Sequence, residues 1–188
     1  MNLIIQKTKI PGMVIIDLDV FRDSRGSFLE SYQKERYKEQ GLDIKFVQDN
    51  HSHSTKNVLR GMHYQINQPQ SHLVYVVRGD IFDVGVDLRI GSPTFGQWLG
   101  FRLSESRPQQ LFLPEGVAHG FCTLSDKADI LYKCTDYFDP YDEGGLLWND
   151  PDLGIDWPID QPIIHNRDSN FPVLKDISKK HLPSFQQN

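Results

Sequence analysis

The sequence predicts an all-β fold, built as a sandwich or a barrel. Short runs rich in β-branched and aromatic residues recur along the chain, and turn-forming residues separate them. Many short strands at a spacing of roughly 8–12 residues are typical of these two architectures. The predicted strands are Val14–Val20, Ile44–Val47, Val58–Tyr64, Leu73–Val77, Ile81–Leu88, Gln97–Leu103, Gln110–Leu113, Gly120–Leu124, Ile130–Thr135 and Gly145–Trp148.

The run Ile81–Leu88 shows the clearest strand pattern. Every second position from Phe82 to Leu88 is apolar, and the positions between them, from Asp83 to Arg89, are polar or glycine. Successive side chains of a strand point to opposite faces, so this run has one apolar and one polar face. The polar face lies either in solvent or in a ligand cavity, and the pattern alone does not decide between them.

One helix is predicted, at about Tyr32–Gln40, with Ser31 as its N-cap and Gly41 as its stop. The tail Pro158–Asn188 is rich in proline and polar residues and predicts an irregular segment. We therefore expect a single domain over residues 1–188, in which the segment from about residue 158 packs back on the body.

Composition excludes several classes of function. The 188 residues carry 20 Lys and Arg against 25 Asp and Glu, and no block of like charge, which argues against a nucleic-acid partner. No stretch approaches the ~20 consecutive apolar residues of a membrane span, and the N-terminus lacks a signal-peptide pattern. Cys122 and Cys134 stand in apolar runs and predict buried free thiols. These features predict a cytoplasmic domain.

Two of the seven histidines have the spacing of a metal site. His51 and His53 would share one face of a strand, and a nearby carboxylate and His119 would have to complete the ligand set. The alternative interpretation is an ordinary polar strand end, which we favour.

A second group of residues suits proton transfer. A histidine, His63 or His119, would be the base, a carboxylate such as Asp168 would orient it, and Tyr132 would be the acid. Tyr132 shares one strand face with Ile130 and Cys134. Strict alternation would place Arg60 opposite His63, but a bulge at the intervening Gly61 would bring both to one side.

Seven motifs then follow in a fixed order. They are Phe21–Glu30, Phe46–Ser52, Asn57–Gln65, Phe82–Val84, Ser92–Trp98, Pro114–Phe121 and Leu131–Lys133. Together they resemble the dTDP-4-dehydrorhamnose 3,5-epimerase family of deoxysugar biosynthesis, and the resemblance runs from about Leu3 to Leu174. It implies a cupin-type jelly roll, a homodimer, no metal, no organic cofactor, and a nucleoside-diphosphate 4-keto-6-deoxyhexose as substrate.

The resemblance also assigns roles to individual residues. His63 matches the family's base, Asp168 the carboxylate that holds the imidazole, and Tyr132 the acid that returns a proton from the opposite face. Arg60 and His119 match positions that line the pocket, and Asp83 matches one that orients His63 or the sugar. The matches to nucleotide-side contacts, partly donated by a neighbouring subunit in the family, are Arg25, Phe28, Glu30, Gln48, Asn50, the base-stacking position Phe138 and the diphosphate-binding position Arg167.

One departure bears on the substrate. The family usually has a Lys near the sugar where this chain has His72, and often an Arg where it has Tyr75. We expect His72 to titrate near neutrality. Its presence leaves open an epimerase that inverts only C3 or only C5, or that takes another nucleotide sugar. Two more distant alternatives are a metal-dependent cupin oxygenase or isomerase using His51, His53 or His119, and a non-catalytic sugar-nucleotide-binding jelly roll.

Overall fold

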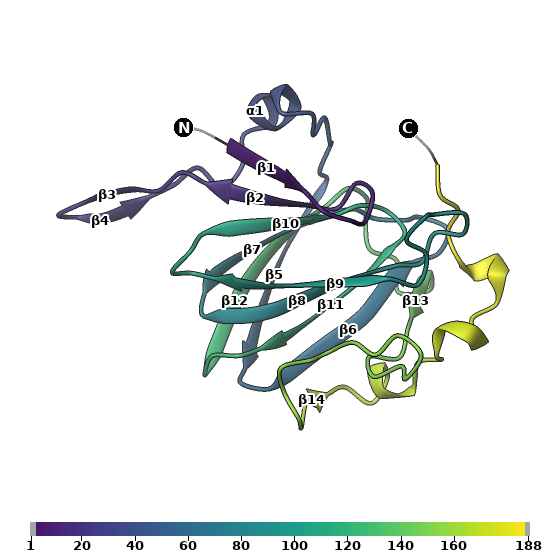
Figure 1. The fold of residues 1–188 in the computed structure, drawn as a ribbon. Helices are drawn as coiled ribbons and strands as arrows, with labels where there is room; N and C mark the ends of the chain where they lie inside the picture. The colour runs from purple at the N-terminus through teal and green to yellow at the C-terminus, as the bar shows by residue number, and fades with distance from the viewer. Residues whose placement is uncertain (1–2, 187–188) are drawn as a thin grey trace.

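The computed structural model describes residues 3–186, and within this range two six-stranded sheets face each other (Figure 1). In order across the sheet, the first contains β1 (Leu3–Lys7), β2 (Val14–Leu18), β10 (Gln109–Leu113), β7 (His72–Arg78), β12 (Lys127–Cys134) and β5 (Gln48–Thr55). The second contains β13 (Glu143–Gly145), β6 (Val58–Gln65), β11 (Val117–Thr123), β8 (Asp80–Asp87) and β9 (Trp98–Ser104), and β14 (Ile163–Ile164) runs parallel to β6. The predicted all-β fold is confirmed.

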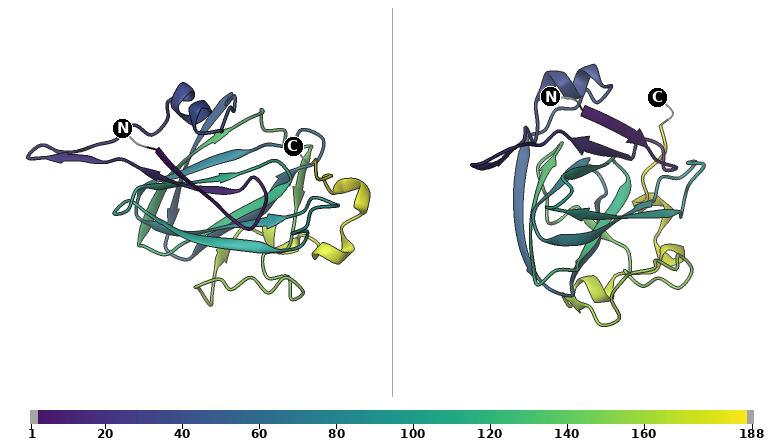
Figure 2. Two further views of the ribbon diagram at one scale, coloured as in Figure 1. Left: turned by 45° about the horizontal axis from the view of Figure 1, so that its top comes forward. Right: turned by 60° about the vertical axis from the view of Figure 1, so that its left-hand side comes forward.

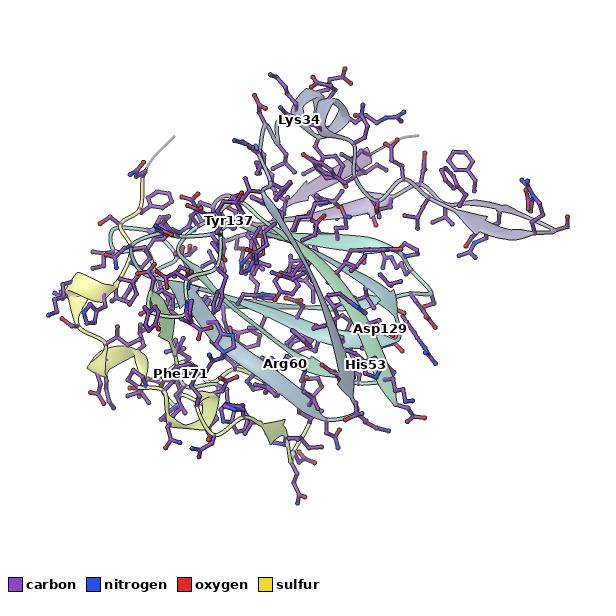
Figure 3. All side chains as sticks on the ribbon, turned by 180° about the vertical axis from the view of Figure 1, so that it is seen from behind. Lys34, His53, Arg60, Asp129, Tyr137 and Phe171 are labelled. Atoms are coloured by element: carbon purple, nitrogen blue, oxygen red, sulfur yellow. The ribbon has the colours of Figure 1, made fainter. Side chains whose placement is uncertain are left out.

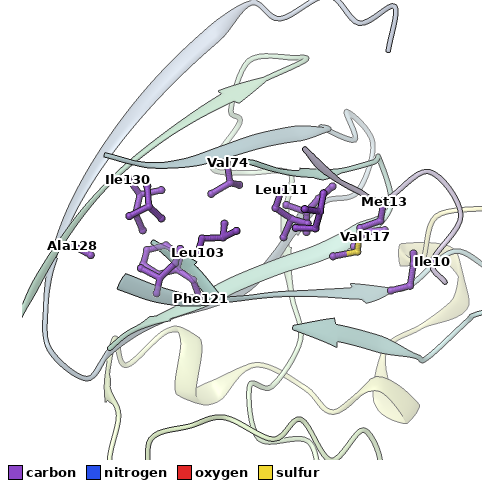
Figure 4. Packing of buried hydrophobic residues seen from close by; sticks show 13 residues of the cluster. Ile10, Met13, Val74, Leu103, Leu111, Val117, Phe121, Ala128 and Ile130 are labelled. Atoms are coloured by element: carbon purple, nitrogen blue, oxygen red, sulfur yellow. The ribbon is translucent and has the colours of Figure 1, made fainter. Parts of the chain in front are cut away.

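The main core fills the space between the two sheets (Figure 4). Val74, Leu111 and Ile130 enter it from the first sheet, and Leu103 and Phe121 from the second. All five are buried. Removing this apolar surface from water, at roughly 25 cal/mol per Å², holds the sheets together.

The outer face of each sheet is also covered. The helix α1 (Lys34–Glu39) buries Tyr37 against Ile16 and Leu73 of the first sheet. The C-terminal segment packs Trp157 and Ile177 against the second sheet. The end of this segment is the yellow part of the chain in Figures 1 and 2. This segment contains the short 3-10 helices η1 (Asp168–Asn170), η2 (Leu174–Asp176) and η3 (Lys179–His181). No helix in the described part of the chain is long and apolar enough to cross a membrane.

Three local predictions are wrong, among them the strand predicted at Gly145–Trp148, because β13 already ends at Gly145. The strand predicted at Ile44–Val47 begins four residues later, as β5. The prediction failed because β5 is a polar edge strand whose sequence has no apolar pattern. The helix is shorter than predicted, and its N-cap is Gln33 rather than Ser31, since the Gln33 side chain accepts a hydrogen bond from the Arg36 amide at 2.6 Å. The Ser31 carbonyl instead accepts from Gln110 Nε2 at 2.6 Å.

A two-stranded hairpin projects away from the sandwich. It consists of β3 (Phe21–Asp23) and β4 (Gly26–Phe28), and in Figures 1 and 2 it extends beyond the rest of the molecule. Phe28 is 63% exposed, and Arg25 forms an ion pair with Asp23 within the hairpin. The projecting arm therefore carries an apolar and a cationic side chain into solvent.

Candidate active site

A cavity of about 690 Å³ opens between the two sheets. Strands β5, β7 and β12 of the first sheet line one wall, and β6 and β11 of the second line the other. The segment after β14 adds further lining residues. Most of the predicted site residues meet here: Gln48, Asn50, Arg60, His63, His72, His119, Tyr132, Phe138, Arg167 and Asp168.

A bulge in β6 brings Arg60 and His63 to the same side. His63 pairs with His119 and Arg60 with Phe121, so three steps on β6 face two on β11. Gly61, inside the bulge, has φ +127°, and a Cβ there would lie 2.5 Å from the Gly120 Cα. Only glycine fits this backbone without strain. The predicted bulge is confirmed.

His63 is held by a carboxylate from the C-terminal segment. Its Nε2 lies 3.0 Å from Asp168 Oδ1, and Asp168 Oδ2 accepts a hydrogen bond from the Gly61 amide at 3.1 Å. Burial raises the pKa of Asp168, but the hydrogen bonds from His63, Gly61 and Arg167 outweigh it and hold the pKa at about 2. The carboxylate is therefore ionised and can only accept, so Nε2 carries the hydrogen and Nδ1 is the basic nitrogen.

A second histidine–carboxylate pair lies on the neighbouring strands. His119 Nε2 is 2.9 Å from Oδ1 of the fully buried Asp83. The expectation that Asp83 orients His63 or the sugar is wrong: β8 places its carboxylate behind His119, outside the cavity lining. The two imidazoles of the second sheet are thus each fixed by a carboxylate of their own.

Tyr132 faces the cavity from the opposite sheet. As predicted, it shares a face of β12 with Ile130, which lies in the core, and with the buried Cys134. Burial raises the pKa of Tyr132, so the phenol keeps its proton at neutral pH. Its cross-strand partner Asn50 donates to Cys134 Sγ at 3.4 Å. The tyrosine is therefore a protonated phenol on the wall opposite that of His63.

His72 lies near both His119 and Tyr132. Its ring centroid lies 5.5 Å from that of His119 and 5.6 Å from that of Tyr132, and its Nε2 is 3.3 Å from Gln70 Oε1. Burial, together with the neighbouring imidazoles, lowers the pKa of His72 to about 3. The expectation that it titrates near neutrality is therefore wrong, and His72 is neutral at physiological pH.

A guanidinium group, side-chain amides and an aromatic ring also line the cavity. Arg60 donates to Ser54 Oγ at 3.1 Å and to the His53 carbonyl at 3.3 Å. Gln48 bonds to Asn50 and also accepts from the Phe138 amide at 3.2 Å, which places the half-exposed Phe138 ring beside the amides. Cation, amides and exposed ring suit an anionic ligand with an aromatic base.

Arg167 lies against the paired side chains of His63 and Asp168. Its Nε donates to Asp168 Oδ1 at 3.1 Å, and its guanidinium also binds the Glu143 carboxylate. Sequence reasoning did not identify Glu143, Gln70 or His165, although all three line the cavity. They lie in a very short strand or in loops, where no periodic pattern marks the face that a side chain occupies.

Besides Asp83, three predicted residues do not line this cavity. Arg25 and Phe28 sit on the projecting hairpin, and Glu30 follows it and forms an ion pair with Arg36 at 3.2 Å. Nothing in the sequence reveals that the hairpin points away from its own sandwich.

Of the three histidines proposed as metal ligands, His119 lies apart from the other two. His51 and His53 do share the outer face of β5, and both contact Asp129 Oδ1, at 3.0 and 2.9 Å. Figure 3 shows His53 and Asp129 close together near the ends of their strands. His119 instead faces the cavity and binds Asp83. The ligand set of the metal alternative is therefore not brought together.

Comparisons with known proteins match this geometry. The profile of the dTDP-4-dehydrorhamnose 3,5-epimerase family matches residues 7–176. The chain is 50% identical over 175 residues to the enzyme of that name from Salmonella typhimurium (92% of this chain, 96% of the relative). It is 51% identical over 169 residues to the one from Pseudomonas aeruginosa (89% and 93%).

A solved structure extends the likeness to three dimensions. It is a dTDP-6-deoxy-D-glucose-3,5-epimerase from Legionella pneumophila in complex with dTDP-4-keto-L-rhamnose, with a TM-score of 0.96 and 46% identity over 99% of this chain and 100% of that one. The cupin-type jelly roll is thereby confirmed. With a profile match over most of its length, this chain belongs to the dTDP-4-dehydrorhamnose 3,5-epimerase family.

Proposed function

We propose that this protein epimerises a dTDP-linked 4-keto-6-deoxyhexose at C3 and C5 by proton abstraction and return, without a metal or organic cofactor. The observation that carries the proposal is the position of His63 and Tyr132 on opposite sheets around one cavity. A base on one wall and an acid on the other suit inversion of a carbon held between them.

His63 is the base in this mechanism. The C4 ketone acidifies the hydrogens on C3 and C5, because the electron pair left behind delocalises onto the ketone oxygen. Nδ1 of His63 takes the proton, and the ionised Asp168 stabilises the resulting imidazolium through Nε2. Asp168 also keeps the imidazole in the tautomer whose Nδ1 is basic.

Tyr132 completes the inversion. Its hydroxyl gives a proton to the face of the carbon opposite His63, and the raised pKa keeps that proton available. His119, fixed by Asp83, lines the same cavity. Arg60, Gln48 and Asn50 bind the nucleotide side of the substrate, Phe138 stacks on its base, and Arg167 contributes positive charge toward the diphosphate.

The active species is a homodimer in this proposal. The hairpin residues Arg25 and Phe28, with Glu30 beside them, lie away from the cavity of their own chain, so they would serve the cavity of a second copy. An isologous dimer would supply the two sites with two hairpins.

The cytoplasm is the proposed location. The structure holds Cys122 and Cys134 as buried free thiols, and burial raises the pKa of Cys122 to about 12 and of Cys134 to about 11. Thiols that persist unpaired fit a reducing compartment.

His72 supports a second candidate, inversion at one carbon only. A neutral imidazole lines the cavity where the family usually has a fixed cation, so the enolate formed at one carbon would be stabilised less than that at the other. His72→Lys would then move the enzyme toward inversion at both carbons.

One experiment tests both candidates. The protein is incubated with dTDP-4-keto-6-deoxyglucose in D2O, and deuterium at C3 and C5 is followed by NMR together with the configuration at each carbon. Exchange and inversion at both carbons supports the double epimerase, and at one carbon the single. No exchange at either carbon contradicts the proposed function.

A further inference from the structure

Four charged or titratable side chains form a continuous chain at one end of the cavity. Glu143 binds Arg167, Arg167 Nε donates to Asp168 Oδ1 at 3.1 Å, and Asp168 Oδ1 lies 3.0 Å from His63 Nε2. The Arg167 Nη2 atom is itself 3.2 Å from His63 Nε2. The first member, Glu143, has no part in the mechanism described so far.

Strand pairing fixes Glu143 in this position. It begins β13, in which Glu143 pairs with Gln65 and Gly145 with His63 across the β6 edge. Its side chain is 10% exposed, that of Asp168 is 3% exposed, and that of Arg167 is 48% exposed. The two carboxylates therefore hold one guanidinium between them, on the side of His63 that already binds Asp168.

The contact between Arg167 and His63 opposes the proposed reaction. Nε2 of His63 carries a hydrogen toward Asp168, so it cannot accept one from Arg167. A guanidinium so close to the ring repels the positive charge that His63 gains when it takes a proton. It also partly neutralises the negative charge of Asp168, which has to stabilise that imidazolium.

Glu143 offsets this effect. With Glu143, Arg167, Asp168 and neutral His63, the net charge is −1 at rest and 0 after proton abstraction. Without the charge of Glu143 the values are 0 and +1. We propose that Glu143 is a positioning residue that acts through Arg167, holding the guanidinium and neutralising it so that Asp168 remains available to the His63 imidazolium.

The inference rests on the proposed function, in which a C–H proton moves to His63 Nδ1 while its electron pair enters the enolate. Asp168 remains ionised throughout the pH range of interest, because its pKa is held at about 2. The titratable and charged groups around His63 come from six strands and the C-terminal segment: Arg60, Tyr64, His72, Asp83, His119, Tyr132, Glu143, His165, Arg167 and Asp168. The test below changes only Glu143 and Arg167 among them.

The test compares the pH dependence of kcat/KM for the wild type, Glu143→Gln, Arg167→Gln and the double variant. Glu143→Gln should move the acidic limb to lower pH by about half a unit or more, because the imidazolium loses support. It should also lower kcat, since the base is weaker. Arg167→Gln should move the limb to higher pH, and the double variant should return it close to the wild-type position.

Further variants separate this effect from a loss of structure. Glu143→Asp keeps the charge and should restore the limb toward its wild-type position. Asp152→Asn removes a carboxylate from an exposed ion pair with Lys175, outside the cavity lining, and should leave the limb unmoved. Circular dichroism checks that each variant is folded, and Arg167→Gln, in which the limb should move to higher pH, provides the measurement if Glu143→Gln does not fold.

Two results would overturn the inference. An increase in KM alone, with an unmoved limb in Glu143→Gln, would make Glu143 a substrate contact. Shifts of the same sign in both single variants would exclude charge balance. The same titration can be read without turnover from the His63 imidazole signal in NMR, assigned with His63→Asn. Suppose that the wild type shows no epimerisation while Glu143→Gln and Arg167→Gln still move the NMR titration of His63 in opposite directions. That result would contradict the proposed function and not this pairing.

Discussion

The Nε2 atom of His63 lies 3.0 Å from the Oδ1 atom of Asp168, across a separation of 105 residues in the chain. The carboxylate reaches this position because η1 lies against β6, where the Gly61 amide donates to its second oxygen. The base of the proposed reaction is thus oriented by the irregular C-terminal segment and not by the sandwich itself.

Replacing the base should stop exchange at both carbons. His63→Asn should still bind the nucleotide sugar but lose on the order of 10²–10⁴ in rate, because the reaction begins with proton abstraction. The measurement is solvent deuterium at C3 and C5 by NMR. His51→Asn, the same substitution on the outer face of β5, should keep wild-type activity. Full exchange by His63→Asn would show that another residue is the base.

Removing the acid should separate exchange from inversion. Tyr132→Phe leaves His63 in place, so a proton can leave and return from the same face, but the opposite face lacks its donor. We expect deuterium to enter the substrate while its configuration is largely retained. NMR of label and configuration in one sample measures both. Epimerisation by Tyr132→Phe at the wild-type rate would show that Tyr132 only lines the cavity.

The sequence predicts most of the sandwich strands, and some of the residues that line the cavity, because these leave local marks. Period-two alternation marks Ile130 and Tyr132 on one face of β12, and glycine marks the bulge at Gly61 that turns Arg60 and His63 to the same side. A polar edge strand such as β5 has no apolar period and was misplaced.

Other features depend on contacts between distant segments. Asp83 behind His119 and Glu143 beside Arg167 follow from strand pairing, which a single sequence does not display. The neutrality of His72 follows from burial among other rings, whereas its residue type alone predicts titration near neutrality. The direction in which the hairpin of Arg25 projects is a property of the fold as a whole.

If the hairpin serves a second chain, two defective variants should restore each other. Arg25→Ala damages the hairpin and His63→Asn damages the cavity. In a mixed dimer one of the two sites would combine an intact cavity with an intact hairpin. After exchange of subunits, an equal mixture should reach about a quarter of wild-type activity. Light scattering should give a mass about twice 21.7 kDa. No gain on mixing, with monomers in solution, would contradict the shared site.

Gly61 and Gly26 have nearly the same φ, so alanine variants at these positions separate the energetic cost of backbone strain from that of a steric clash. Gly61 has φ +127° and a Cβ there would lie 2.5 Å from the Gly120 Cα, whereas Gly26 has φ +128° with nothing within 4 Å. Gly26→Ala should cost only the backbone strain, on the order of 1 kcal/mol. Gly61→Ala should lower the free energy of unfolding by about 1–3 kcal/mol more and displace Arg60 and His63. Urea unfolding of both variants checks the difference, and equal losses would exclude the collision.

The partly buried imidazole of His72, packed against His119 and Tyr132, should make the protein less stable in acid. Its pKa is about 3 in the folded protein and near 6.5 in an unfolded chain. Between these two values the unfolded state binds more protons, so the free energy of unfolding falls as pH decreases from about 6.5 toward 3. His72→Asn keeps a polar side chain near Gln70 but removes the titration. Between pH 7.5 and 5 the wild type should therefore lose up to about 2 kcal/mol more than the variant. Urea unfolding at the two pH values measures this double difference, in which titrating groups that do not interact with His72 cancel. Equal losses would mean that folded His72 takes up a proton as readily as the unfolded chain does.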